Sequence, residues 1–422
     1  MLDIKFIRQN PDKVKEGCQK KQIKVDIDTL LVLDEKKRGI IKELELLRAE
    51  QNKLSDQVRQ EKDETKKSGL IIASRELGPK MKELEENLKA ITQEVDKLML
   101  QIPNLPFDEV PVGKDDSENK VLREVGKRTK FNFEFKDYLT LAENFDLIDI
   151  KRAGKTSGSR FGFLKGEAVL MEFALVKFVF DNLLKEGFVP IIPPVMLKEE
   201  MALGTGYLEA SDKEEAYFIP GDNFYLVGTS EQSMLAMHAD ETFEEKELPK
   251  KYCGFSTCFR REAGSYGKDT KGILRVHQFD KIEMICFSKP EDSAKELQFF
   301  LGMEEKLMKA LKIPYRVIQI CTGDLGRPAA VKYDIEAWIP SENRYRETHS
   351  TSNCTDFQAR RLNIKYKANT GLNYVHILNG TAFAIGRTLI ALIENYQQKD
   401  GSIVIPNVLQ KYMGIKKIVK KK

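Results

Sequence analysis

The chain has 422 residues, which is too long for one ordinary hydrophobic core and favours two domains or one domain with an appendage. Its 41% hydrophobic and 32% charged residues are typical of a globular protein with one unusually charged part. The 69 basic and 65 acidic residues nearly balance, so this balance neither requires nor excludes a nucleic-acid partner, and any basic surface must be local.

The six cysteines and four histidines are scattered along the chain, without a CxxC pair. A zinc site needs clustered ligands, and scattered cysteines are typical of a reducing compartment, so we expect neither zinc nor disulfides. The sequence contains no signal-peptide pattern and no apolar run of about 18 residues. We therefore expect a cytoplasmic protein without a membrane partner.

Two heptad patterns occupy the first hundred residues. The spacing of four and three residues that marks a coiled-coil helix joins Ile40, Leu44, Leu47, Gln51, Leu54 and Val58. A second such seam joins Leu77, Met81, Leu84, Leu88, Ile91, Val95 and Leu98. The sequence DETKKSGL between them supplies a helix-stop signal at Gly69. We expect an antiparallel two-helix arm over residues 1–103, in which Pro79 kinks the second helix or delays its start.

The segment QIPNLPFDEVPVGKDDSENK, rich in proline and acidic residues, marks a linker, which we place at residues 104–129. Helical and strand-like patterns alternate from residue 130 to residue 422. EAVLMEFALVKFVFDNLLKEGF is apolar on every side and predicts a buried helix ending at Gly187, and VPIIPPVML predicts one short strand. Hairpin-like strands without regular helical crossovers favour an antiparallel sheet with helices on one side, an α+β domain.

Charged residues recur in FRREAGSYGKDTKGILRVHQFDKIE, residues 259–283. Period-two alternation in a strand places on one face Arg275, His277, Phe279, Lys281 and Glu283. Arginine suits phosphate, an aromatic ring can stack on a base, and the loop AGSYGKDTKG is consistent with a mobile flap over an anion. The wet face of a hairpin would show the same charges, so the residues alone leave a nucleotide site and a solvated surface both open.

Three other segments carry candidate site residues. Thr229 and Glu231 in LVGTSEQS could bind an ammonium and a hydroxyl group, or could cap a helix. Glu347 and Ser350 in YRETHSTSN offer the oxygen ligands that Mg²⁺ accepts beside phosphates. Arg387 in LNGTAFAIGRTL could meet phosphate or stack on a base, or could cap a neighbouring strand.

Together these segments resemble the class II aminoacyl-tRNA synthetases, in the form found in seryl-tRNA synthetases. Residues 259–283 resemble motif 2 of that class, KGEAVLMEFALVKFVF…GFVPIIPPVM resembles motif 1 with its proline at Pro194, and LNGTAFAIGRTLIALIENYQ resembles motif 3. GTSE, YDIEAWIP, FQARR and the two-helix arm also match, so the resemblance covers essentially the whole chain. It implies the class II antiparallel sheet flanked by helices, with an N-terminal coiled-coil arm.

The resemblance also implies roles for individual residues. For ATP it assigns Arg260 to the α-phosphate, Glu262 to the adenine end, Arg275 to the outer phosphates, the Val276 backbone to the nucleotide, and Phe279 and Arg387 to the two faces of the adenine. It assigns Glu347 and Ser350 to a bridging Mg²⁺. Around serine it places Thr229, Glu231, Arg260, Glu283, Asn379 and Thr381. The resemblance assigns catalysis to Arg260, Arg275 and Arg387. It assigns no role to His277, Lys281 or Arg261.

The function that the resemblance implies is activation of L-serine by ATP and its transfer to tRNA(Ser), and to tRNA(Sec) where present, by a homodimer. Only residues 388–422 follow Arg387, which are too few for an anticodon-binding domain. The arm is therefore expected to bind the tRNA. Two alternatives are a synthetase paralogue acting as a binding protein and a ligase with a non-tRNA acceptor. The first predicts substitutions at key positions such as Arg260 and Glu283, which are intact, and the second predicts loss of the arm.

Overall fold

The computed structural model describes residues 1–208, 211–263 and 271–420. The chain divides into two compact units, Met1–Pro103 and Asn104–Lys422. Most of the predicted mobile flap, residues 264–270, and the last two residues of the basic C-terminal tail lie outside the described residues. Within the described ranges, no helix combines the length and the apolar character that crossing a membrane requires.

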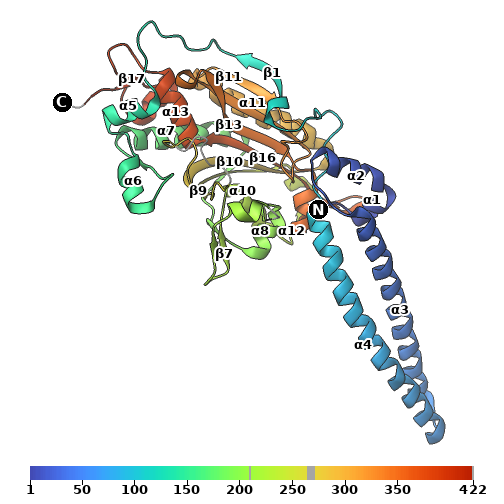
Figure 1. Ribbon diagram of the computed structural model, residues 1–422. Helices are drawn as coiled ribbons and strands as arrows, with labels where there is room; N and C mark the ends of the chain where they lie inside the picture. The colour runs from blue at the N-terminus through green and yellow to red at the C-terminus, as the bar shows by residue number, and fades with distance from the viewer. Residues whose placement is uncertain (209–210, 264–270, 421–422) are drawn as a thin grey trace. The chain divides into compact units, whose positions relative to one another are not determined.

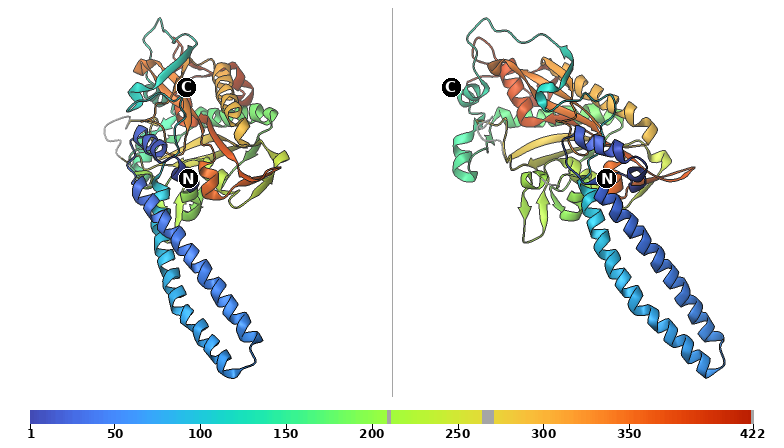
Figure 2. Two further views of the ribbon diagram at one scale, coloured as in Figure 1. Left: turned by 90° about the vertical axis from the view of Figure 1, so that its right-hand side faces the viewer. Right: turned by 45° about the vertical axis from the view of Figure 1, so that its right-hand side comes forward.

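The first unit is helical: its elements are α1 (Ile4–Gln9), α2 (Pro11–Lys20), α3 (Ile27–Gln60) and α4 (Glu64–Gln101). Helices α3 and α4 run side by side along their length (Figure 2). Every residue of the two predicted seams is buried or half-buried, which confirms the heptad prediction. Ion pairs across the hairpin join Arg48 to Glu85 (2.8 Å) and Lys80 to Glu43 (2.9 Å).

The turn of the hairpin lies earlier than predicted. Helix α4 begins at Glu64, because the carboxylate of Asp63 accepts hydrogen bonds from the backbone N–H groups of Thr65 (2.9 Å) and Lys66 (3.2 Å). Gly69 therefore lies inside α4, and its prediction as a stop signal is wrong. Pro79 also lies inside α4, on the exposed side, and does not delay the start of the helix.

An eight-stranded sheet organises the second unit, with the strand order β1-β11-β12-β13-β16-β10-β9-β4 (Figure 1). All its neighbours are antiparallel except β4 and β9. The strands are β1 (Lys120–Val125), β4 (Val189–Ile191), β9 (Lys250–Phe259), β10 (Gln278–Ser288), β11 (Tyr315–Gln319), β12 (Val331–Ile339), β13 (Arg344–Asn353) and β16 (His376–Ala384). This arrangement confirms the predicted α+β class.

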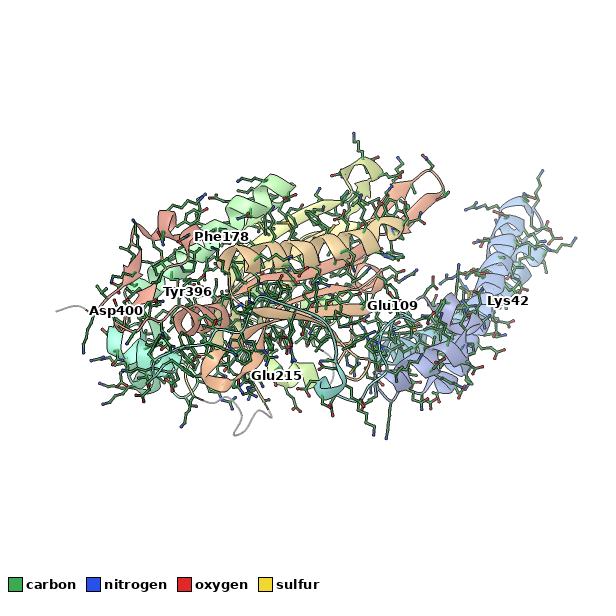
Figure 3. The ribbon with its side chains drawn as sticks, turned by 90° about the horizontal axis from the view of Figure 1, so that it is seen from above. Lys42, Glu109, Phe178, Glu215, Tyr396 and Asp400 are labelled. Carbon is green, nitrogen blue, oxygen red and sulfur yellow. The ribbon has the colours of Figure 1, made fainter. Side chains whose placement is uncertain are left out.

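Long helices pack on one face of this sheet and form the main core. They are α7 (Glu167–Leu183), α11 (Ser293–Leu311), α13 (Ile385–Asn395) and the shorter α14 (Asn407–Met413). Figure 3 labels two members of this layer, Phe178 on α7 and Tyr396 directly after α13. The even-numbered β10 residues Ile282, Met284 and Cys286 point into this core.

The opposite face of the sheet is only partly covered. Helices α10 (Ser230–Ala236) and α12 (Phe357–Leu362) pack there, with Ile285 and Phe287 of β10 buried beneath them. The odd-numbered residues nearer the start of β10 line a cavity instead. The alternation of β10 thus separates the core from the candidate site.

Smaller elements complete the second unit. A three-stranded sheet of β5 (Met196–Lys198), β7 (Phe224–Leu226) and β6 (Phe218–Ile219) carries α8 (Glu199–Thr205) and α9 (Ser211–Glu215). Another contains β8 (Thr242–Glu244), β14 (Lys365–Ala368) and β15 (Gly371–Tyr374). The remaining helices and strands are α5 (Tyr138–Phe145), β2 (Ile148–Asp149), α6 (Ile150–Ser157), β3 (Phe163–Leu164), β17 (Ile403–Val404) and β18 (Lys417–Ile418).

Two local predictions need correction. VPIIPPVML forms two strands in different sheets, β4 and β5, because the Pro193–Pro194 pair between them has no N–H groups to donate to a ladder. The helix predicted to be buried all round exposes part of one side, where Leu170 and Phe173 are 50% and 59% exposed. Its predicted end is correct, since a short 3₁₀ turn leads from α7 to Gly187 in the left-handed conformation.

Candidate active site

The uncovered part of the sheet holds a cavity of about 320 Å³. The structure brings all the predicted site residues together around it. They are Thr229, Glu231, Arg260, Glu262, Arg275, Val276, Phe279, Glu283, Glu347, Ser350, Asn379, Thr381 and Arg387. They come from strands β10, β13 and β16, from the residues flanking β9 and β10, and from the N-terminal ends of α10 and α13.

Two β-bulges turn residues toward this cavity. On β13, Glu347 is opposite Glu336 of β12 and His349 is opposite Ile335, so that Thr348 has no opposite residue in the strand register. This extra residue places Glu347 and Ser350, three positions apart, on the same side of the strand. On β16, Ala382 is the extra residue, and Thr381 and Ala384 both line the cavity. A regular strand would have directed the members of each pair to opposite faces.

One end of the cavity contains a buried hydrogen-bond network around Glu231. The carboxylate accepts hydrogen bonds from Tyr207 Oη (2.9 Å), Gln358 Nε2 (2.9 Å) and Asn379 Nδ2 (3.0 Å). Burial raises the pKa of Glu231, and the nearby negative charge of Glu283 raises it further. The hydrogen bonds hold Glu231 and Asn379 in fixed orientations beside the second carboxylate of this end.

That second carboxylate, Glu283, forms a buried ion pair with Lys281, whose Nζ lies 2.5 Å from Glu283 Oε2. The same oxygen accepts hydrogen bonds from Thr381 Oγ1 (3.3 Å) and Thr229 Oγ1 (3.5 Å). Lys281 also lines the cavity, which sequence reasoning missed. The sequence could have predicted this, because Lys281 alternates with Phe279 and Glu283 and therefore shares their face of the strand.

Three arginines lie toward the other end. Arg260 Nε donates to the carbonyl of Gly228 (3.2 Å), and its guanidinium lies 5.3 Å from the centre of the Phe279 ring. Arg275 Nη1 is 3.4 Å from Glu262 Oε2, and Arg387 Nη1 donates to Glu347 Oε2 (3.1 Å). Guanidinium groups beside a half-buried aromatic ring suit a ligand that carries phosphates and a flat ring.

Glu347 lies beside these charges. Its side chain is 45% exposed. Partial desolvation would raise its pKa, but the positive charges of Arg387 and Lys332 outweigh this effect and lower the pKa. Lys332 forms an ion pair with Asp334 (3.2 Å) and lines the cavity. The sequence analysis did not predict Lys332 as a site residue. Its spacing of two residues from Asp334 in KYDIEAWIP could have indicated that both side chains share one face of a strand.

His277 does not share the face predicted for it. Strand β10 begins only at Gln278, so the alternation does not extend back to His277. Its Nδ1 lies 3.1 Å from the Arg260 carbonyl oxygen, and its ring contacts that of Phe161 at 5.3 Å between centres. His277 therefore supports the backbone beside Arg260, outside the residues that line the cavity.

The Lys281–Glu283 pair makes a prediction about stability. Lys281→Met should lower the free energy of unfolding by about 3–5 kcal/mol, because it leaves a buried carboxylate unpaired. Adding Glu283→Gln should recover most of that loss. Urea unfolding followed by circular dichroism measures both changes.

The matched control is Lys250→Met, because the ion pair of Lys250 with Glu247 (3.0 Å) is more exposed. Its effect should stay below about 1 kcal/mol. A loss for Lys281→Met no larger than that of the control would contradict the assigned burial of the pair.

Comparisons with known proteins agree with this geometry. Residues 1–106 match the seryl-tRNA synthetase N-terminal domain, and residues 217–396 match the tRNA synthetase class II core domain (G, H, P, S and T). The serine–tRNA ligase of Dictyoglomus turgidum is 45% identical over 426 residues, covering 100% of both chains, and that of Rubrobacter xylanophilus is 43% identical, covering 98% of each.

Solved structures give the same result. Seryl-tRNA synthetase from Pyrococcus horikoshii, crystallised with ATP, has a TM-score of 0.92 and 40% identity, covering 100% of both chains. The cytoplasmic serine–tRNA ligase from Naegleria fowleri, in complex with AMP, has a TM-score of 0.88 and 35% identity, covering 100% of this chain and 99% of the other. The chain belongs to the seryl-tRNA synthetase family of class II aminoacyl-tRNA synthetases.

Proposed function

We propose that the protein activates L-serine with ATP to form seryl-adenylate, and transfers the serine to tRNA(Ser), and to tRNA(Sec) where it is present. The observation that carries the proposal is that one cavity is lined both by the buried, hydrogen-bonded carboxylates Glu231 and Glu283 and by three arginines. Its relatives are serine–tRNA ligases over their full length. The intact set of cavity residues disfavours a paralogue that only binds. Charging of tRNA would place the protein in the cytoplasm, where translation occurs.

The first step needs positioning rather than a protein base. The serine carboxylate is already nucleophilic and attacks the α-phosphorus of ATP in line, forming one P–O bond while the bond to pyrophosphate breaks. Arg260 is proposed to hold the α-phosphate and Arg275 the outer phosphates, so that fixed positive charges stabilise the transition state. Phe279 and Arg387 would hold the adenine ring, with Glu262 and the Val276 backbone beside the nucleotide.

Magnesium fits the donors on β13. The bulge at Thr348 turns Glu347 and Ser350 to the same side, and the lowered pKa of Glu347 keeps its carboxylate charged. Mg²⁺ prefers one or two protein oxygens together with substrate phosphates. Glu347 and Ser350 would therefore hold the ion, which would supply charge neutralisation on the phosphates.

The second step forms an ester. A ribose hydroxyl at the 3′ end of the tRNA attacks the carbonyl carbon of seryl-adenylate, a C–O bond forms, and the carbonyl–phosphate C–O bond breaks. AMP leaves with the electron pair, and the hydroxyl proton passes to the departing phosphate or to water.

Recognition of serine falls to the Glu283 end. Glu283 and Thr381 would bind the ammonium and hydroxyl groups of serine, with Thr229, Glu231 and Asn379 around them. The hydrogen bonds that join Glu283 to Thr229 and Thr381, and Glu231 to Asn379, support this proposal. Without the substrate hydroxyl these buried polar groups lose a partner, so alanine should be rejected strongly, by a factor of about 10⁴–10⁵. Threonine can be rejected only by the size of the pocket, which allows a smaller factor of about 10–200 per methyl group.

ATP–pyrophosphate exchange tests this proposal directly. The protein should catalyse exchange with serine, much less with threonine, and least with alanine and glycine, because the last two lack the hydroxyl. Exchange is measured with labelled pyrophosphate at matched amino-acid concentrations. Absence of serine-dependent exchange in the unmodified protein would refute the enzyme assignment.

We further propose a division of labour along the chain: residues 1–103 form the tRNA-binding arm, residues 104–129 a linker and residues 130–422 the catalytic domain. The match of residues 1–106 to the family's N-terminal domain supports this assignment. The outer faces of α3 carry exposed basic side chains suited to phosphates, including Lys42, which Figure 3 labels.

Removal of the arm should separate the two activities. Deletion of roughly residues 30–100 should abolish charging of tRNA(Ser) and leave serine-dependent exchange intact, because the cavity lies wholly in the second unit. Both reactions are measured on the same preparation. Loss of the two activities together would show that the arm supports the catalytic unit instead.

We also propose that the protein is a homodimer. Large apolar side chains are exposed in segment 170–192, among them Phe173 (59%) and Ile192 (81%), and this segment includes the edge strand β4. An exposed apolar segment on a sheet edge is typical of a surface that a second copy covers.

The double variant Phe173→Glu, Ile192→Glu should convert the dimer to monomers, because charge would be buried between the two copies. Sedimentation velocity measures the mass. Val112→Glu is the control, since Val112 is 72% exposed but lies outside the segment. A monomeric unmodified protein would refute the dimer proposal.

A further inference from the structure

Asn104, the first residue of the proposed linker, is a buried part of the second unit. Its exposed fraction is 4%. Its side-chain Nδ2 donates hydrogen bonds to the carbonyl oxygens of Pro328 and Cys354, each at 2.8 Å, which lie 224 and 250 residues further along the chain. Its backbone N–H donates to the carbonyl of Arg327 (2.9 Å). The amide group of Asn104 therefore joins two segments that are distant in the sequence, whereas a flexible linker would leave its polar groups in solvent.

The two segments that Asn104 joins belong to the wall of the candidate active site. Pro328 and Cys354 both line the cavity. Pro328 packs beside Gly206, where an added Cβ would lie 3.4 Å from Pro328 Cγ. The next residue, Tyr207, donates a hydrogen bond to Glu231 (2.9 Å). Pro328 thus lies close to the residues that orient one of the two buried carboxylates.

Cys354 contacts the same hydrogen-bond network from another side. Asn379 Nδ2 donates to Cys354 Sγ (3.7 Å) and to Glu231 Oε1 (3.0 Å). The backbone N–H of Cys354 donates to the carbonyl of Ile377 on β16 (2.9 Å), the strand that also carries Asn379. The position of Cys354 therefore bears directly on the orientation of Asn379.

Backbone strain marks this junction. Thr355, directly after Cys354, has a φ of 49°, a left-handed conformation that β-branched residues rarely adopt. Its N–H donates to Asn353 Oδ1 (2.8 Å), and its hydroxyl oxygen accepts from Asn104 Nδ2 (3.1 Å). A strained conformation persists only where its surroundings hold it. Loss of the Asn104 amide would leave buried carbonyl groups without their donor beside this strained turn, so that the turn is free to relax.

We propose that Asn104 is a positioning residue for serine binding. Its amide holds Cys354 in place, Cys354 contacts Asn379, and Asn379 in turn holds Glu231. The inference rests on the proposed function, because it takes Asn379 and Glu231 as residues that surround the bound serine. Asn104 acts on serine only through these side chains and does not touch it.

The residues proposed for ATP are held by other partners. Arg260 Nε donates to the carbonyl of Gly228 (3.2 Å), and Arg387 Nη1 donates to Glu347 Oε2 (3.1 Å). A change at Asn104 should therefore weaken the binding of serine and leave the binding of ATP nearly unchanged. A residue that only stabilises the fold would not separate the two substrates in this way.

Asn104→Ser tests the proposal, because it removes the amide that bridges the two carbonyl groups. We expect the KM for serine in ATP–pyrophosphate exchange to rise at least about fivefold. The KM for ATP, and kcat at saturating serine, should stay within about twofold, because the loss concerns serine binding alone. Both KM values are measured on one preparation by varying each substrate in turn.

Asn395→Ser is the matched control. Asn395 Nδ2 also bridges two carbonyl groups, those of Trp338 and Ala391, each at 2.8 Å, and Asn395 lies outside the residues that line the cavity. Thermal unfolding followed by circular dichroism should show a loss of stability in both variants, but the control should leave the KM for serine within about twofold. An equal rise of this KM in both variants, or an equal rise of the KM values for serine and ATP in Asn104→Ser, would overturn the proposal.

A double variant tests the route through Asn379. If Asn104 acts through this side chain, Asn104→Ser should raise the KM for serine by less than about twofold when Asn379→Ala is already present. A full, independent effect of Asn104→Ser in that background would also overturn the proposal.

Thr355→Ala replaces Asn104→Ser if that variant does not fold, since it removes only the 3.1 Å contact with the Asn104 amide. It should raise the KM for serine about twofold without changing that for ATP, and an unchanged KM for serine would count against the proposal. Absence of serine-dependent exchange in the unmodified protein would refute the proposed function itself, so the two failures are distinguishable.

Discussion

The alternation of strand β10 is the constraint on which the rest of the second unit depends. Its even-numbered side chains Ile282, Met284 and Cys286 are buried against the helical layer, and this burial fixes which face the odd-numbered ones must take. Phe279, Lys281 and Glu283 then stand in the cavity at intervals of two residues. A shift of one residue in register would move the entire set to the wrong side of the sheet, so the energy that stabilises the core also positions the site.

The electrostatics of the cavity follow from this placement. Lys281 is close enough to pair with Glu283 because both lie on the odd-numbered face of β10. Each charge of this buried pair compensates the other. The arginines come instead from the ends of strands and from the start of α13, where long side chains can reach a larger ligand. Glu283 and Thr381, proposed for serine, thus lie within strands, whereas Arg260 and Arg275, proposed for the phosphates, lie beyond strand ends.

Regular periodicity in the sequence predicted much of this fold. The heptad seams of α3 and α4, the α+β class and the one-sided grouping of Phe279 and Glu283 all follow from spacing, because burial selects apolar residues at regular intervals. The prediction of the turn of the arm at Gly69 was wrong, because the N-cap at Asp63 starts α4 earlier and outweighs the weak helix-breaking effect of Gly69. Periodicity also could not show the bulges at Thr348 and Ala382, because an unpaired residue depends on the neighbouring strand. The proposed roles of individual site residues came from the family resemblance, because no local pattern encodes which ligand atom a side chain contacts.

We propose that one cavity holds ATP beside its arginines and serine at Glu283. A crystal structure of the protein with a non-reactive seryl-adenylate analogue tests this most directly. We expect the adenine between Phe279 and Arg387, the phosphate analogue at Arg260, and the seryl ammonium and hydroxyl groups within hydrogen-bond distance of Glu283 and Thr381. A seryl group bound away from Glu283, or an adenine bound away from Phe279 and Arg387, would contradict this proposal.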